Sequence, residues 1–343
     1  MFRMESILQE FVIERSTFVL VGILAVMLFI LAKAADSLVD KAVEISHTAG
    51  IPKALIGATI VSLGTTLPEA SVSVLAAFEG NAGLALGNAV GSIICDTGLI
   101  LGLGALIKPL PLDRRIVNRQ GLIQLGSGIL LILCCLPFSN INQIYDLGGQ
   151  LPQVVGFIFI ILLAAYFFWS YLAAMKAENR DSDQTDTVLT WQTITKDLLI
   201  MSASIIAVIL SSKVLIGCAE ELAHRLNVPE SVIAASLVAF GTSLPELVTV
   251  MSSIKKGQGE LAIGNIIGAD ILNILFVAGA AAAVTPGGLE VPTDFFTIHF
   301  PVMLSLLIVF RIGIVTCKTH LSRLFGGILL GIYFTFLIAN YFL

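Results

Sequence analysis

Charged residues are scarce in this sequence. Asp, Glu, Lys and Arg make up 13% of its 343 residues, whereas a soluble domain has about 25%. Hydrophobic residues make up 57%, and the mean hydropathy is +0.96. These values exclude a water-soluble globular protein and indicate a chain that crosses a membrane several times. They also exclude a nucleic-acid-binding protein, because the sequence has no basic face and no interleaving of aromatic with basic residues.

Histidine and cysteine are also few. The four histidines do not cluster in the sequence, and the five cysteines lie in apolar segments without the spacing of a metal site. Adjacent Cys134 and Cys135 suit neither a relaxed disulfide nor a zinc site, so we interpret the cysteines as packing residues. Residues 1–14 are polar and the next apolar run has full spanning length, so no cleavable signal peptide is expected. We expect no enzymatic activity and no cofactor.

The apolar runs predict an all-α integral membrane protein with ten transmembrane helices, since a span needs about 20 apolar residues. A polar linker at 177–195 separates a first membrane repeat, 1–176, from a second, 196–343. Its aspartates do not follow an EF-hand pattern, so we interpret it as a solvated connector. The expected spans are 16–45, 51–78, 82–107, 116–137, 151–175, 197–226, 229–254, 260–284, 294–312 and 321–343.

The distribution of basic residues predicts the orientation. Most Lys and Arg residues of the loops follow the odd-numbered helices. Basic loops favour the cytoplasmic side of a membrane. These loops, including the linker, are therefore predicted to be cytoplasmic, and both termini to lie outside.

A hexapeptide that contains a proline and a glutamate occurs twice within apolar spans. Positions 64–69 read GTTLPE and positions 241–246 read GTSLPE. The offset along the chain from position 64 to position 241 is here called the repeat spacing. The same offset aligns the Gly-Asn pair at 87–88 with the pair at 264–265 without a gap. Each half holds five spans, an odd number, so the halves are predicted to be inverted repeats. Inverted repeats are an architecture of transporters.

The hexapeptides predict broken helices 2 and 7 at the membrane midplane. Pro68 cannot donate a hydrogen bond to the carbonyl of Gly64, and its ring clashes with that carbonyl. Broken backbone at this depth is tolerated where it lines a cavity or is buried in protein. The freed carbonyls, the hydroxyls of Thr65 and Thr66, and the carboxylate of Glu69 are hard oxygen ligands of the kind that calcium prefers. A site for calcium or sodium follows, and the second hexapeptide repeats it.

The glycine-rich segments after the hexapeptides add further ligands. Asp96 follows Glu69 at the same distance along the chain as Asn273 follows Glu246. Ser92 shares a helix face with Asp96, because the two are four residues apart. Glycines four apart in both segments also permit close packing of helices. We expect the side chains of Glu69, Asp96, Glu246 and Asn273 to converge.

The charge of this cluster limits what it can bind. Three carboxylates in a dry pocket repel one another, and burial disfavours their charged forms. A divalent ion or several monovalent ions would compensate them. An empty site would take up protons, so protons are expected to compete with the metal ions at low pH.

The paired motifs resemble the two alpha repeats of the sodium/calcium exchangers of the calcium/cation antiporter superfamily, in their prokaryotic type. The resemblance covers both repeats and, through the topology, nearly the whole chain. It implies ten helices in two inverted halves and electrogenic exchange of sodium for calcium. It also implies a multi-pass protein of the plasma (inner) membrane of a prokaryote, whose partners are calcium ions, sodium ions and the lipid bilayer.

The resemblance also implies individual roles. Glu69 and Glu246 match the calcium-ligating glutamates of the family, while Thr65 and Thr242 match residues that give carbonyl or hydroxyl ligands. Hydroxyls of the sodium sites are matched by Thr66, Ser243 and Ser92, and contributing backbone carbonyls by Ser62 and Ala239.

Two positions depart from the family pattern. Ala269 stands where the second repeat commonly has a serine, which removes a hydroxyl from one flanking sodium site. At the positions of Asp96 and Asn273, some family members have the acid in the first half and others have it in the second half. Potassium-dependent relatives have an aspartate at the position of Asn273, so the asparagine favours potassium independence. The stoichiometry stays open.

Other functions are weighed against this one. A calcium/proton antiporter of the same superfamily would carry a glutamate soon after the first Gly-Asn pair, but Val90 and Gly91 stand there. A potassium-dependent sodium/calcium exchanger is a second alternative. An intramembrane aspartyl protease would need a Gly-x-Gly-Asp motif, which residues 268–270 do not supply. An ion channel would conduct without coupling. For the antiporter we expect alternating access, with the first and sixth helices as the moving parts.

Overall fold

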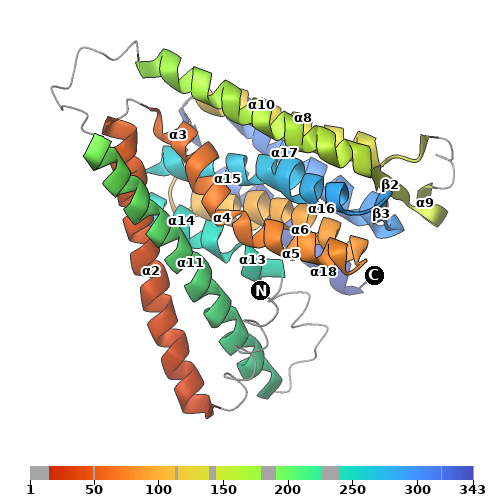
Figure 1. Ribbon diagram of the computed structural model, residues 1–343, viewed down its shortest axis with the longest axis horizontal. Coiled ribbons are helices and arrows are strands. Elements are labelled where there is room, and N and C mark those ends of the chain that lie inside the picture. Colours follow the sequence, from red (N-terminus) through yellow and green to blue (C-terminus); the bar gives the residue numbers. More distant parts are fainter. Residues whose placement is uncertain are drawn as a thin grey trace.

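The computed structural model describes residues 15–48, 51–112, 115–138, 144–178, 191–225, 239–317 and 319–342. These residues form a mostly helical molecule with short strands between some of the helices (Figure 1). The first half contains α2 (Thr17–Thr48), α3 (Lys53–Ile56), α4 (Ser62–Thr65), α5 (Leu67–Phe78), α6 (Ala82–Ile94), α7 (Gly102–Ile107), α8 (Ile116–Cys135), α9 (Ile144–Leu147) and α10 (Gln153–Glu178). The second half contains α11 (Trp191–Arg225), α13 (Ala239–Thr242), α14 (Leu244–Lys255), α15 (Gly259–Leu272), α16 (Gly279–Val284), α17 (Phe300–Thr316) and α18 (Arg323–Phe342).

Within the described residues, four segments are wound as π-helix and connect α-helical pieces. π-Helical turns are rare and are frequent at functional sites. The sequence pattern does not predict these segments, because a π-helical turn has the same apolar composition as the helix around it. The four segments are η1 (Gly57–Val61), η2 (Cys95–Leu101), η5 (Asn273–Ala278) and η6 (Phe295–His299).

The number of membrane spans agrees with the prediction as far as the structure describes the chain. Within the described residues, eight helices are long and apolar enough to cross a membrane, and a bent pair formed by 53–65 and 67–78 makes a ninth. The seventh expected span, 229–254, falls partly on residues 229–238, which lie outside the described part. Only α13 and α14 represent it. The seventh expected span therefore stays a prediction.

Some helix ends differ from the expected ones. The fourth span was expected to reach Pro137, but α8 ends at Cys135 and Leu136 is extended, with φ −69° and ψ 131°. A proline disfavours helical backbone in the residue before it, which explains the earlier end. The linker between the halves is shorter than the expected 177–195, because α10 continues to Glu178 and α11 begins at Trp191.

Two short antiparallel ladders, absent from the all-helical prediction, connect the halves. β1 (Leu110–Pro111) pairs with β4 (His320–Leu321), and β2 (Gly149–Pro152) pairs with β3 (Gly288–Val291). Gly288 has φ +102°, and a Cβ there would lie 2.2 Å from the carbonyl oxygen of Leu151. Only glycine fits this approach. Strands of two to four residues are too short to leave a periodic pattern in the sequence.

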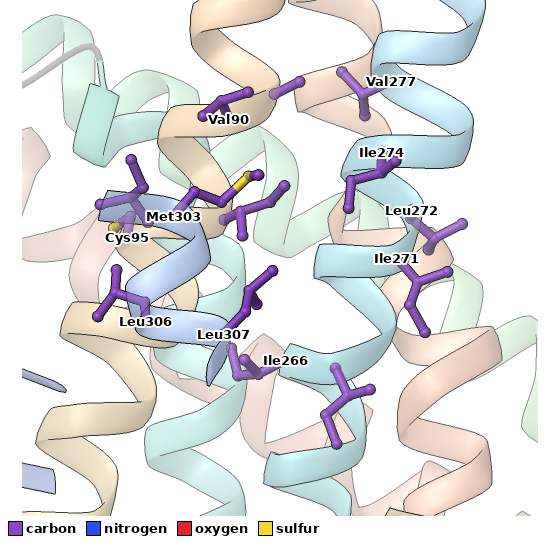
Figure 2. Packing of buried hydrophobic residues seen from close by; sticks show 14 of the residues in the cluster. Val90, Cys95, Ile266, Ile271, Leu272, Ile274, Val277, Met303, Leu306 and Leu307 are labelled. Atoms are coloured by element: carbon purple, nitrogen blue, oxygen red, sulfur yellow. The ribbon is translucent and has the colours of Figure 1, made fainter. Parts of the chain in front are cut away.

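The centre of the molecule is formed by α15 and by the helices that pack around it. Every residue of α15 from Leu261 to Leu272 is buried. Figure 2 shows apolar side chains of α6, α15 and α17 meeting in one cluster, among them Val90, Ile266 and Leu307. The expected close packing at the repeated glycines is present in the second half, where a Cβ on Gly268 would lie 2.5 Å from the Cα of Ala58.

The helices α2 and α11 form a separate long pair along one side of the molecule (Figure 1). They pack against each other over much of their length, and α2 also packs against α14. Many of their apolar side chains are exposed, including Phe18, Phe29 and Leu199. Exposed apolar side chains on membrane helices are the expected lipid-facing surface.

Candidate cation-binding site

Both hexapeptides interrupt their helices at the expected place. The first helix piece, α4, ends at Thr65, and α5 begins at Leu67 with a bend of 45° between the two parts of the span. In the second hexapeptide α13 ends at Thr242 and α14 begins at Leu244. The cause is the proline that follows, which has no N–H to continue the helical hydrogen bonds. The predicted interruptions are thus confirmed, and their depth at the membrane midplane stays a prediction.

The two glutamates occupy equivalent places after these breaks. Glu69 lies in the first turn of α5 and Glu246 in the first turn of α14. Each side chain is 1% exposed. The first turn of a helix has unpaired N–H groups and a partial positive charge, which favours a carboxylate there. Each break therefore supplies a buried acid at a helix start.

The two hexapeptides meet in space although they are far apart in the sequence. The hydroxyl Oγ1 of Thr66 donates a hydrogen bond to Oε1 of Glu246 over 3.4 Å. Thr66 belongs to the first hexapeptide and Glu246 to the second. This contact brings the acid of one half beside the broken backbone of the other, as the predicted convergence requires.

Asn88 makes a second connection that was missing from the predicted site. Its amide Nδ2 donates to the backbone carbonyl of Glu69 over 3.1 Å and to Oγ of Ser73 over 3.0 Å. Its Oδ1 accepts from Oγ1 of Thr242 over 3.2 Å. Asn88 on α6 therefore links the start of α5 to the second hexapeptide. The repeated Gly-Asn pairs were the signal, but the partners of the amide depend on packing.

The residues predicted to accompany the glutamates are also buried. Asp96 and Asn273 are each 1% exposed, and they lie at the starts of the π-helical segments η2 and η5. The charge of Asp96 acts on Glu69, and that of Glu246 acts on both Glu69 and Asp96. The structure thus places the three predicted carboxylates within electrostatic range of one another.

Many oxygens at this centre have no hydrogen-bond partner among the described residues. Buried polar groups in native proteins are nearly always paired, with protein, water or ions. A cluster of unpaired oxygens is what a cation would use as ligands. The unpaired atoms of the predicted residues are Oε1 and Oε2 of Glu69, Oε2 of Glu246, Oδ1 and Oδ2 of Asp96, Oδ1 of Asn273, Oγ of Ser92 and Oγ of Ser243.

Ser62 and Ala239 are the two residues that are expected to contribute backbone carbonyls. The carbonyl of Ser62 accepts from the backbone N–H of Thr66 over 2.9 Å and from Oγ1 of Thr65 over 3.3 Å. A carbonyl has two lone pairs, so Ser62 could bind a cation only by giving up one of these bonds. Ala239 is the first residue of α13, and its side chain lies outside the described part of the structure.

The acids alone do not form a metal-binding group. Among the described residues, no three His, Cys, Asp or Glu side chains are grouped closely enough to hold a metal ion. Carboxylates in a dry pocket repel one another, which opposes their closer approach. A cation in this centre would therefore also need oxygens from the hydroxyl, amide and carbonyl groups around the acids.

Comparison with known proteins shows which family the sequence resembles. Residues 19–172 and 196–342 match the model of the sodium/calcium exchanger protein family. The inner membrane protein YrbG of Escherichia coli (strain K12) is 33% identical over 299 residues, which cover 85% of this chain and 87% of that protein. The sodium/calcium exchanger MaX1 of Methanosarcina acetivorans is 29% identical over 346 residues, which cover 94% of this chain and 98% of that protein.

Solved structures share the fold. The sodium-calcium exchanger NCX_Mj soaked with 10 mM Na⁺ and zero Ca²⁺ superposes with a TM-score of 0.79 at 24% sequence identity, over 96% of this chain and 100% of that chain. At this identity the likeness concerns the fold. The family model covers both halves of the sequence, on either side of the linker. The chain is therefore a multi-pass membrane protein that belongs to the sodium/calcium exchanger protein family.

Proposed function

We propose that this protein is a secondary antiporter that exchanges sodium for calcium across the membrane by alternating access. The observation that carries the proposal is the meeting of the two hexapeptides, where Glu69 and Glu246 are buried with unpaired carboxylate oxygens. Buried acids in membrane helices are costly and mark ion pathways. The matching relatives include the sodium/calcium exchangers MaX1 and NCX_Mj.

The chemistry of the site favours hard cations. The groups at the centre are carboxylates, hydroxyls, an amide and backbone carbonyls, and calcium binds six to eight oxygens of such groups. Sodium prefers the same donors and can compete for them. In this account Glu69 and Glu246 bind calcium directly, and the hydroxyls of Thr66, Ser92 and Ser243 complete sodium sites. Protons compete by neutralising the carboxylates, and the chain acts as a transporter rather than an enzyme.

Ten helices in two inverted halves, 1–176 and 196–343, form the proposed architecture. The family model supports it by matching in two segments, 19–172 and 196–342. The ladders support it too, because each pairs a strand of one half with a strand of the other. The proposed membrane is the plasma (inner) membrane of a prokaryote, with the basic loops in the cytoplasm and both termini outside.

Alternating access requires parts that move, and we assign this role to α2 and α11. Contacts between α2 and the C-terminal end of α14 support the assignment, because Glu246 lies in the first turn of the same helix. Nζ of Lys256 pairs with Oδ1 of Asp40 over 2.6 Å, and Oγ of Ser252 donates to Oδ1 of Asp36 over 2.6 Å. On the proposed orientation this end faces the cytoplasm. Release of these contacts would let α2 slide past α14 and open that side.

Calcium uptake into proteoliposomes, with the sodium, potassium and proton gradients varied separately, tests the proposed function. Vesicles loaded with sodium and diluted into sodium-free calcium solution are expected to take up calcium. Uptake should collapse when the sodium gradient is removed with an ionophore. A potassium gradient should have no effect, because Asn273 stands where potassium-dependent relatives have an acid.

Variants of the two glutamates provide the control for the site. Glu69→Gln and Glu246→Gln remove a charge and keep the size of the side chain, so each is expected to abolish calcium uptake. Near-normal uptake by either variant would contradict the proposed site. Uptake that follows the proton gradient alone would identify a calcium/proton antiporter, and large uncoupled currents would identify a channel.

A further inference from the structure

A fourth buried carboxylate lies close to the proposed site but outside its two-fold pattern. Asp270 on α15 is 0% exposed. The repeat spacing relates it to Ile93, an apolar residue of the first half. The acid therefore has no counterpart in the first half. A charged side chain within a membrane helix is costly and functional by default, so Asp270 needs an explanation of its own.

Two polar side chains from other helices hold one oxygen of this carboxylate. Oγ1 of Thr97 on η2 and Nε2 of Gln124 on α8 both donate to Oδ2 of Asp270, each over 2.5 Å. The repeat spacing relates Thr97 to Ile274 and Gln124 to Pro301, which are both apolar. The cluster formed by Asp270, Thr97 and Gln124 is thus polar in all three members, whereas the related positions of the repeat are apolar.

The other oxygen of the carboxylate is unpaired. Oδ1 of Asp270 has no hydrogen-bond partner among the described residues. Asn273, one helical turn further on, also has an unpaired Oδ1, and both oxygens of Asp96 are unpaired. The charged groups that interact electrostatically with Asp270 are Asp96 on η2 and Glu246 on α14. The neighbouring group on α8 is the uncharged amide of Gln124. All of these charges are negative.

A purely structural role does not account for the charge. An asparagine at this position could accept the hydrogen bond of Thr97 and would avoid the cost of a buried charge in a membrane helix. The bonds to Thr97 and Gln124 also fix the carboxylate so that Oδ1 is the atom left available. A cation at Oδ1 would supply the missing partner.

We propose that Asp270 extends the cation site by a fourth carboxylate and binds one additional singly charged cation, sodium or a proton, at Oδ1. The proposal rests on the proposed function, because the additional cation belongs to the same centre. Glu69, Asp96 and Glu246 carry three negative charges, and Asp270 raises the number to four. A bound calcium ion balances two of them, so two singly charged cations balance the rest instead of one.

The test counts the cations bound by the purified full-length protein with and without Asp270. Asp270→Asn removes the charge and keeps an oxygen for Thr97. Bound sodium is measured by equilibrium dialysis with ²²Na in calcium-free buffer, and bound protons by potentiometric titration between about pH 5 and pH 9. The variant is expected to bind one sodium ion fewer if sodium is the ligand. If a proton is the ligand, the sodium count stays equal and the titration lacks one proton.

A matched control variant and a separate transport measurement distinguish this proposal from the proposed function. Asp197→Asn makes the same substitution at a buried aspartate that pairs with Lys41 over 2.8 Å, and it is expected to leave the sodium count unchanged. Equal sodium counts and equal titrations in Asp270→Asn and the unaltered chain would overturn the proposal. Sodium-driven calcium uptake by the unaltered chain tests the proposed function separately, so either can fail alone.

The unaltered chain gives an answer even if the variant does not fold. Its sodium-saturated form is expected to hold a fourth sodium ion or to show the infrared carbonyl band of a buried protonated carboxyl group. Three sodium ions without that band would overturn the proposal.

Discussion

Replacement of Asn88 by alanine should destabilise the protein far more than the same change at its repeat mate, Asn265. The two residues close the aligned Gly-Asn pairs at 87–88 and 264–265. Asn88 makes three hydrogen bonds, to Glu69, Ser73 and Thr242, at 3.0–3.2 Å. Asn265 is completely buried, but neither polar atom of its side chain has a partner among the described residues. The same mutation therefore removes three bonds at one position and none at the other.

The expected size follows from these bonds. At about 1 kcal/mol for each bond, Asn88→Ala should lower the free energy of unfolding by about 3 kcal/mol, whereas Asn265→Ala should change it by less than about 1 kcal/mol. At about 2 °C per kcal/mol for a chain of this size, the midpoint of thermal unfolding should fall by about 6 °C in Asn88→Ala. Calcium affinity should also fall in that variant, because Asn88 positions the backbone of Glu69.

Thermal unfolding of the detergent-solubilised variants provides the assay. A thiol-reactive dye reports unfolding when the buried free cysteines Cys95 and Cys135 become accessible. The midpoints of the two variants and the unaltered protein are compared at one heating rate. Equal losses in the two variants, or a larger loss in Asn265→Ala, would refute the connecting role of Asn88.

Three further predictions concern transport and packing. Acidification from about pH 8 to about pH 6 should slow calcium uptake, because protons neutralise the buried carboxylates; a constant initial rate over this range would count against the competition. Gly268→Ala should reduce the yield of folded protein in size-exclusion chromatography, because its Cβ would lie 2.5 Å from the neighbouring helix backbone. Gly331→Ala should fold normally, because no atom of the described residues lies within 4 Å of its Cβ. Lys256→Ala removes an ion pair with Asp40, which is 66% exposed, and a hydrogen bond to the backbone carbonyl of Asp36 over 2.7 Å. At about 1 kcal/mol for each contact, the uptake rate should change by less than about thirtyfold; complete loss of uptake would show a stronger role.

The sequence alone was sufficient for the parts of the structure that depend on local chemistry. Pro68 and Pro245 had to interrupt their helices wherever the rest of the chain lay, because neither can donate a backbone hydrogen bond. The burial of Glu69 and Glu246 followed from apolar runs of spanning length, and the repeat indicated that the two acids belong together. These features are confirmed by the breaks at 65–67 and 242–244 and by the low exposure of both acids.

Other features could not be predicted because they depend on contacts between distant residues. The bond between Thr66 and Glu246 and the partners of Asn88 arise only after the helices pack. Asp270 is visible in the sequence as a polar residue, but the sequence does not show its hydrogen-bond partners on η2 and α8. The strands are too short for a period of two, and π-helical turns have the composition of the helix around them.

The position of a bound cation is the most direct test of the shared site. Strontium would be soaked into crystals of the protein in place of calcium, because its anomalous signal locates it independently of the rest of the map. We predict one peak within about 3 Å of carboxylate oxygens from both Glu69 and Glu246, since calcium–oxygen bonds measure about 2.3–2.6 Å. A peak beside only one of these acids, or strontium bound elsewhere, would contradict a single site built by both halves of the chain.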